Sequence, residues 1–107
     1  MDNPSKIQWT ERASADLESL VRYISRRDPK AAGRIGMGIY KKAQVLLEYP
    51  EMGSYLDELR DQGWRKLIFR RWKIIYTYRQ GVIIIGRVWP AAMGDADLTT
   101  PLPDEDD

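Results

Sequence analysis

The residues most able to do chemistry in this chain of 107 residues gather in one stretch, residues 64–89. The stretch holds seven basic side chains and no acidic one. A run of cations attracts an anionic partner, and it can also stabilise negative charge that develops during a reaction. The predicted residues for binding a partner or target are Arg65, Lys66, Arg70, Arg71, Lys73, Arg87 and Trp89.

The residue types that are absent narrow the chemistry. The chain has no His and no Cys. This excludes a Ser-His-Asp triad, a thiolate nucleophile, a disulfide framework and a zinc site built on His or Cys, so we expect no metal and no cofactor. Residues 90–107 carry six acidic side chains and no basic one, although the net charge of the whole chain is only +1. Such an asymmetry concerns the partners of a protein rather than its fold.

Two amphipathic helices are predicted ahead of the basic stretch. Apolar residues recur at spacings of three and four from Ala13 to Ile24, and again from Ala32 to Leu46. Thr10 and Asp28 are suitable N-cap residues, and Pro29 is tolerated in the first turn of the second helix. Because the link between the two helices is short, we expect an antiparallel helical hairpin.

Three glycines, Gly33, Gly36 and Gly38, lie inside the second predicted helix. Each costs about 1 kcal/mol of helix stability relative to Ala. No strand precedes them and no Gly-Lys-Ser/Thr sequence follows, so they do not form a phosphate-binding loop. We expect that they allow the two helices to approach closely.

The basic stretch itself predicts three strands, at residues 64–69, 72–79 and 82–89. Gln80-Gly81 is typical of a two-residue hairpin turn. A further short strand is predicted at residues 6–9. The fold class is therefore α+β: an N-terminal strand, a two-helix antiparallel hairpin, and a three-stranded antiparallel sheet packed against the helices.

Arg87 differs from the other cations of the stretch. Simple alternation along its strand places it on the same face as Ile83 and Ile85. An Arg on an otherwise apolar face usually has a partner, so we expect a carboxylate of this chain or of another protein beside it. Asp16 is a candidate structural partner for a neighbouring cation.

Taken in order, residues 6–89 resemble the RelE/ParE toxin superfamily, which includes plasmid stabilisation proteins, and they resemble its ParE branch most. The first helix reads Trp9-Thr10-x-x-Ala13-x-x-Asp16-Leu17-x-x-Leu20-x-x-Tyr23-Ile24, which is similar to the opening of ParE-type toxins. The second helix reads Pro29-x-Ala31-Ala32-x-Arg34, and the sheet reads Arg65-x-Leu67, Ile74-Ile75-Tyr76 and Arg87-Val88. The order of these pieces and the loop lengths between them carry the resemblance.

The resemblance implies a single toxin domain over residues 1–95. The prolines and acidic residues near the end of the chain predict a flexible acidic tail over residues 96–107. The resemblance also implies the toxin of a type II toxin–antitoxin pair, held in a hetero-oligomer by a cognate antitoxin. ParE-type relatives are taken to poison DNA gyrase by binding it, so we expect an inhibitor rather than an enzyme. Many relatives end in a basic segment that contains His, whereas this chain has no His, Tyr, Lys or Arg beyond Trp89.

Three alternatives stay open. A RelE-like ribosome-dependent mRNA endoribonuclease would need cations and a proton-transfer group, for which Arg65, Arg87 and Tyr76 are the candidates. The second alternative is a non-toxic relative that binds only the antitoxin. The third is a nucleic-acid-binding protein. No signal peptide and no membrane-spanning apolar run is recognisable in the sequence, so we expect a cytoplasmic protein.

Overall fold

The computed structural model describes residues 3–93, apart from the side chain of Glu58. The predicted domain boundary at residue 95 and the predicted tail lie outside the described residues. The elements are β1 (Lys6–Trp9), α1 (Glu11–Ser25), α2 (Pro29–Gln44), the 3₁₀ helix η1 (Val45–Leu47), β2 (Ser54–Tyr55), the 3₁₀ helix η2 (Asp57–Gln62), β3 (Arg65–Phe69), β4 (Trp72–Arg79), β5 (Val82–Pro90) and the 3₁₀ helix η3 (Ala91–Met93).

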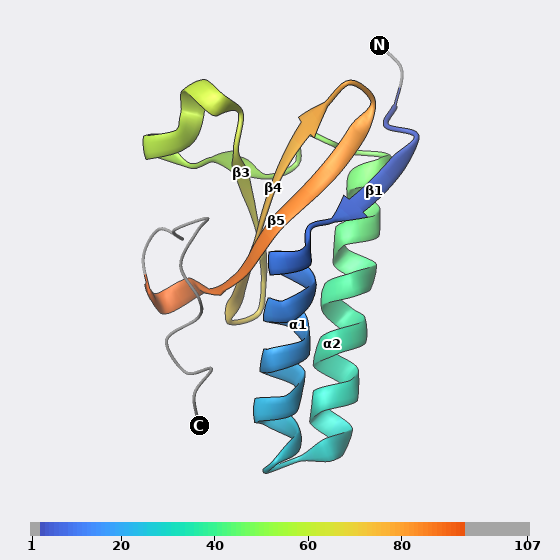
Figure 1. Cartoon of the computed structure of the whole chain (residues 1–107), viewed down its shortest axis with the longest axis vertical. Coiled ribbons are helices and arrows are strands. Elements are labelled where there is room, and N and C mark those ends of the chain that lie inside the picture. Colours follow the sequence, from blue (N-terminus) through green and yellow to red (C-terminus); the bar gives the residue numbers. More distant parts are fainter. Residues whose placement is uncertain (1–2, 94–107) are drawn as a thin grey trace.

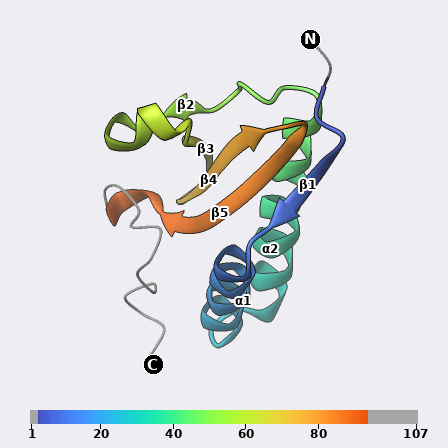
Figure 2. The ribbon, with the colours of Figure 1, turned by 45° about the horizontal axis from the view of Figure 1, so that its top comes forward.

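The strands form one mixed sheet in the order β1-β5-β4-β3-β2 (Figure 2). The α+β class and the antiparallel pairing of β3, β4 and β5 are confirmed, and the sheet has two more strands, β1 and β2, than the three that were predicted. β1 runs parallel to β5, with Lys6 opposite Val82 and Trp9 opposite Ile85, and β2 adds to the other edge, antiparallel to β3. The strand signals in the sequence are local, whereas the partner of β1 lies at the other end of the domain.

The helices α1 and α2 form an antiparallel hairpin whose upper part covers one face of the sheet and whose far end extends beyond it (Figure 1). Both predicted N-caps are confirmed. The Thr10 hydroxyl accepts a hydrogen bond of 3.0 Å from the Ala13 N–H, and the Asp28 carboxylate accepts one of 3.1 Å from the Ala31 N–H.

The glycines of α2 have different surroundings. A Cβ at Gly36 would lie 2.8 Å from Val21 Cγ2 on α1, so the predicted close approach of the helices is confirmed there. A Cβ at Gly38 would overlap the ring of Phe69, at the end of β3. Gly33 has nothing within 4 Å of such a Cβ, so packing does not require glycine at that position.

Apolar side chains are buried on both faces of the sheet. The larger cluster lies between the sheet and the helices, and it consists of Ala13, Leu20, Ile39, Ala43, Leu46, Leu67, Ile74, Tyr76, Ile83, Ile85 and Val88. The smaller cluster lies on the opposite face, under the β2–η2 segment, and consists of Leu56, Ile75 and Trp89 with Leu59 and Trp64 against it. We call this opposite face the helix-free face.

A β-bulge interrupts the pairing of β4 with β5. Tyr76 lies opposite Ile85, whereas the preceding residue Ile75 lies opposite Arg87. Gly86 is therefore an extra residue in β5, and the side chains after it change faces. A residue without a Cβ suits such a position, because the backbone bends there.

The bulge moves Arg87 to the helix-free face. Ile83 and Ile85 lie in the cluster under the helices, and Val88 continues that series after the bulge. Arg87 and Trp89 then lie on the opposite face. The prediction that Arg87 shares a face with Ile83 and Ile85 is therefore wrong, because simple alternation holds only where the strand has no bulge.

Candidate functional site

The helix-free face carries two rows of side chains that cross three strands. Directly paired residues of antiparallel strands lie on the same face, so the pairings define these rows. One row is Lys66, Ile75 and Arg87, and the other is Ile68, Lys73 and Trp89. Each row mixes basic and apolar side chains, and together they contain four of the seven predicted binding residues.

Arg87 is fully buried and forms an ion pair with Asp16 of α1. Its Nε donates to Asp16 Oδ2 at 2.7 Å and its Nη2 donates to Asp16 Oδ1 at 2.9 Å. The Val88 N–H also donates to Asp16 Oδ2, at 3.0 Å. The prediction that Asp16 pairs with a nearby cation is confirmed. Arg87 was also predicted to contact a partner or a target, and the structure places its side chain in the interior rather than on the surface.

The reason for this arrangement lies at the edge of β5. β1 pairs with β5 only as far as Ile85, and α1 takes over beyond that point. The Thr10 hydroxyl, at the start of α1, donates to the Gly86 carbonyl at 3.2 Å. Further along the same helix, the Asp16 carboxylate accepts a hydrogen bond from the Val88 N–H. α1 thus satisfies an edge that a strand would otherwise have to cover.

Two further predicted binding residues are also buried. Lys73 is 4% exposed and Trp89 is 6% exposed. Trp89 packs with Leu56 and Ile75, and the Arg87 guanidinium lies 4.8 Å from the centroid of its ring. The structure thus places these two predicted binding residues, like Arg87, in the interior.

Arg65 faces the other way and holds a loop. Its Nη1 donates to the carbonyl of Gly53 at 2.6 Å and to that of Glu51 at 3.3 Å. Its guanidinium also lies 4.0 Å from the centroid of the Tyr55 ring. Arg65 is paired with Tyr76 across β3 and β4, so both lie on the side of the sheet that bears the helices.

Tyr76 is fully buried, and its hydroxyl fixes the same loop. It donates to the Pro50 carbonyl at 2.8 Å and accepts from the Gly53 N–H at 2.9 Å. Burial raises the pKa of Tyr76, and the Gly53 hydrogen bond and the charge of Arg65 oppose this only in part. A hydroxyl with a raised pKa is a poor general base at neutral pH.

The three candidate nuclease residues therefore do not meet. Arg65 and Tyr76 bind the loop that contains Gly53, on the side of the helices. Arg87 extends from the opposite face of the sheet and binds Asp16 of α1 at the edge of β5. Acid–base chemistry on a phosphodiester needs such groups around one phosphate.

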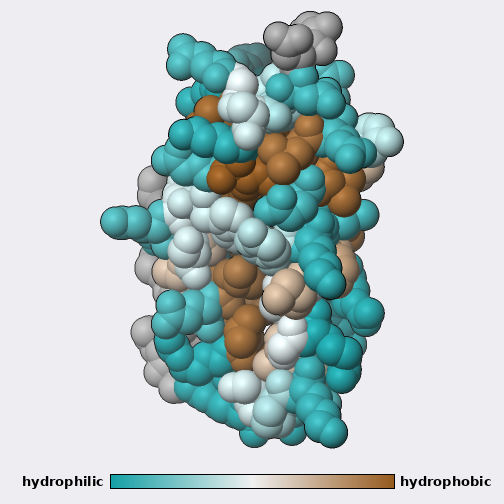
Figure 3. Space-filling view, turned by 90° about the vertical axis from the view of Figure 1, so that its right-hand side faces the viewer, coloured by the Kyte–Doolittle hydropathy of each residue, from teal (hydrophilic) through white to brown (hydrophobic). Residues whose placement is uncertain are grey.

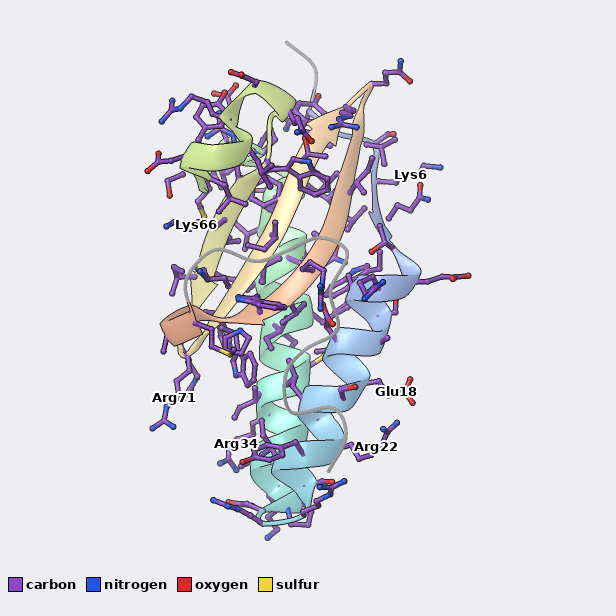
Figure 4. All side chains as sticks on the ribbon, turned by 60° about the vertical axis from the view of Figure 1, so that its left-hand side comes forward. Lys6, Glu18, Arg22, Arg34, Lys66 and Arg71 are labelled. Carbon is purple, nitrogen blue, oxygen red and sulfur yellow. The ribbon has the colours of Figure 1, made fainter. Side chains whose placement is uncertain are left out.

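The accessible part of the predicted site is smaller. Lys66 is half-buried, and Arg70 and Arg71 are exposed in the β3–β4 turn, where Arg70 has a φ of 54°. Lys66 and Arg71 point away from the helices in Figure 4. Between them along the chain, Ile68 is 49% exposed. We call Lys66, Ile68 and Arg71 the open patch.

Sequence reasoning missed Ile68. A signal for it was present, because Leu67 and Phe69 pack into the core and strand alternation turns the residue between them outward. A large apolar side chain beside cations on a surface is typical of protein interfaces. Within residues 3–93 there is no group of His, Cys, Asp and Glu that would hold a metal ion, and no helix there is long and apolar enough to cross a membrane.

Comparison with known proteins assigns this arrangement to a family. The family model described as "ParE toxin of type II toxin-antitoxin system, parDE" matches residues 7–94. The chain belongs to this family. The match begins in β1 and runs through β5, so it spans the elements that carry the Asp16–Arg87 pair and the open patch.

Two curated relatives carry toxin names, and a solved structure shares the fold. The chain is 34% identical over 89 residues to Toxin RelE2 of Caulobacter vibrioides, covering 82% of this chain and 97% of the relative. It is 34% identical over 74 residues to Putative toxin Y4kP of Sinorhizobium fredii, covering 69% and 74% respectively. A solved structure titled "Chromosomal ParDE TA system from P. aeruginosa" has the same fold, with a TM-score of 0.67, 20% identity, and coverage of 78% of this chain and 91% of that chain.

Proposed function

We propose that this ParE-family chain is the toxin of a type II toxin–antitoxin pair and that it inhibits DNA gyrase by binding it. A cognate antitoxin neutralises it in a hetero-oligomer. One observation supports inhibition by binding rather than by catalysis. Arg65, Tyr76 and Arg87, the candidate catalytic residues, each form hydrogen bonds to groups of their own chain. The proposed target and antitoxin are cytoplasmic, so we propose the same location for the toxin.

An mRNA endoribonuclease is the less favoured function. RNA cleavage without a metal needs a base for the 2′-hydroxyl, an acid for the leaving oxygen, and cations at the phosphorane. Tyr76 is buried with a raised pKa, and Arg87 is buried against Asp16. Releasing either group for catalysis would leave buried polar partners unsatisfied, at a cost of at least about 1–3 kcal/mol.

The open patch supports a protein partner. Lys66 and Arg71 supply positive charge, and Ile68 supplies exposed apolar surface beside them. An acidic, partly apolar segment that orders on the toxin would satisfy both properties. The structural relative from P. aeruginosa is titled as a ParDE TA system, which supports an antitoxin as this partner.

The test is a gyrase supercoiling assay with the purified protein, run beside an mRNA cleavage assay on translating ribosomes. We expect loss of supercoiling with trapped, cleaved DNA, and intact mRNA. Intact gyrase activity together with cut mRNA would contradict the proposal and favour the endoribonuclease. Activity in neither assay, with the antitoxin still bound, would identify a non-toxic relative instead.

A further inference from the structure

A surface cavity of about 450 Å³ lies apart from the helix-free face. It is lined by residues 48–52, which follow η1, together with Tyr78 of β4 and Asn3. Its volume is within the usual range for sites that bind small molecules. We call this cavity the loop pocket. Figure 3 faces the side of β1 and α2 and shows two apolar patches among hydrophilic side chains, the larger toward the end that holds β1.

The loop that lines the pocket is held rigidly by hydrogen bonds. The Tyr49 N–H donates to the Val45 carbonyl at 3.0 Å, and the Met52 N–H donates to the Tyr49 carbonyl at 3.1 Å. The Pro50 carbonyl accepts from the Tyr76 hydroxyl, which is itself buried. A pocket built this way is preformed, so a ligand does not have to order it on binding.

The side chains of the loop pocket match a cationic ligand. Glu48 and Glu51 are exposed carboxylates, and within the described part of the chain neither forms an ion pair. Tyr49 is 56% exposed and Met52 is 46% exposed beside them. Carboxylates next to an aromatic face attract a cation through charge and through the ring quadrupole.

The protein already uses such stacking within its own chain. The Arg65 and Arg60 guanidinium groups lie 4.0 Å and 4.8 Å from the centroid of the Tyr55 ring. No cation of residues 3–93 lies over Tyr49 in the same way. Tyr49 thus lines the loop pocket together with Glu48 and Glu51, and no cation of the described residues stacks on its ring.

We propose that the loop pocket binds an arginine side chain of the antitoxin. A guanidinium is planar, so it stacks on Tyr49 while its N–H groups donate to Glu48 and Glu51, which a lysine ammonium does less well. The identity of the protein that carries this arginine rests on the proposed function. The preference for a guanidinium rests on the pocket alone.

An antitoxin segment would then meet sites of opposite charge on the toxin. Its acidic residues would contact Lys66 and Arg71 of the open patch, and its arginine would enter the loop pocket. A segment bound in the reverse direction would place its acidic residues against Glu48 and Glu51 and its arginine against Lys66 and Arg71. The two sites would therefore fix the chain direction of the bound segment.

The first experiment tests the pocket chemistry without an antitoxin. ¹⁵N-labelled toxin is titrated at low salt with N-acetyl-arginine amide, and separately with N-acetyl-citrulline amide, which has the same shape without the charge. We expect saturable chemical-shift changes at residues 48–52 and Tyr78 with the arginine compound only.

Two double variants serve as controls for this titration. The Glu48→Gln/Glu51→Gln variant should weaken this binding about fivefold or more. The Glu18→Gln/Asp61→Asn variant loses the same charge elsewhere and should bind as the wild type does. Equal shifts with citrulline, or none at the loop, would overturn the inference.

The second experiment tests the carrier. The affinity of the toxin for the antitoxin encoded beside it is measured with the same two double variants. We expect about tenfold weaker binding for Glu48→Gln/Glu51→Gln and no change for Glu18→Gln/Asp61→Asn. Unchanged affinity in both would reject the pocket contact while leaving the toxin–antitoxin proposal intact. If the wild type binds no such protein, the proposed function and the antitoxin as carrier both fail, and the arginine titration still reports on the pocket by itself.

Discussion

Asp16 and Arg87 stand 71 positions apart in the sequence, yet their side chains form two hydrogen bonds inside the protein, where both are almost completely buried. Asp16 also accepts the N–H of Val88, so one carboxylate joins the first helix to both the side chain and the backbone of the last strand. The position of α1 against β5 therefore depends on this carboxylate.

The first prediction concerns this pair. The substitution Asp16→Asn should destabilise the fold by about 3–5 kcal/mol, because it leaves the Arg87 cation buried without a counter-charge. Urea unfolding followed by circular dichroism measures the change. The exposed pair Arg22–Glu18, at 2.8 Å, is the control, and Glu18→Gln should change stability by no more than about 0.5 kcal/mol. A similar small effect for Asp16→Asn would show that the pair does not hold the helix in place.

The second prediction concerns Tyr76. The substitution Tyr76→Phe should cost about 1–3 kcal/mol, because the Pro50 carbonyl and the Gly53 N–H lose a buried partner. Differential scanning calorimetry at neutral pH measures this cost. Wild-type stability should be retained if the hydroxyl contributes nothing to the loop.

The raised pKa of Tyr76 also predicts a pH dependence. Above the ordinary tyrosine pKa of about 10, the unfolded chain ionises this hydroxyl while the folded chain still holds the proton. The unfolded state then binds fewer protons, so stability falls as the pH rises from about 10 toward the folded pKa, and the contribution is complete below pH 10. Unfolding free energies between pH 9 and about 11 should fall less steeply in Tyr76→Phe than in the wild type. Equal slopes would contradict the assignment.

The third prediction uses the glycines of α2 as a matched set. Gly33→Ala should stabilise the protein by up to about 1 kcal/mol, because Ala favours the helix and its methyl group meets nothing. Gly38→Ala should destabilise it by about 1–3 kcal/mol, because the methyl group would overlap the Phe69 ring. Melting temperatures that move in opposite directions are the expected result, and a shift in the same direction would contradict the packing.

The fourth prediction tests the open patch. The double substitution Lys66→Glu/Arg71→Glu should weaken antitoxin binding at least about tenfold and leave the unfolding free energy within about 0.5 kcal/mol of wild type. Lys6→Glu reverses an exposed charge on β1, at the other end of the sheet from the patch (Figure 4), and should leave affinity nearly unchanged. Calorimetric titration at two salt concentrations separates the two variants. Equal losses would mean that net charge, rather than the patch, attracts the partner.

The local elements of the fold could be predicted from the sequence because their signals are local. Thr10 and Asp28 mark the starts of the two helices, and Gln80-Gly81 marks the β4–β5 turn, where both residues have positive φ. The parallel pairing of β1 with β5 was not predictable in this way. The strand that β1 joins must have a free edge, and the packing of the whole domain decides which strand this is.

The candidate site was predicted less well, and Gly86 is the main reason. A bulge moves every later side chain to the other face, and a lone glycine in a strand does not say whether a bulge is present. The pairing of a cation with Asp16 was foreseen from residue types alone. The burial of Lys73 and Trp89 was not, since it depends on the β2–η2 segment above them, where the sequence pattern indicated only a polar loop.

The pairing of β1 with β5 has a consequence for the timing of synthesis. Val82, opposite Lys6, leaves the ribosome 76 residues after it. At about 5–20 residues per second, this interval lasts several seconds. During it, Ile7 and Trp9 have no completed sheet to pack against, and Asp16 has no Arg87 to bind. The toxin therefore completes its fold, and gains any activity that needs the fold, only as translation of its domain finishes. An antitoxin already present in the cell can meet each new molecule during this interval.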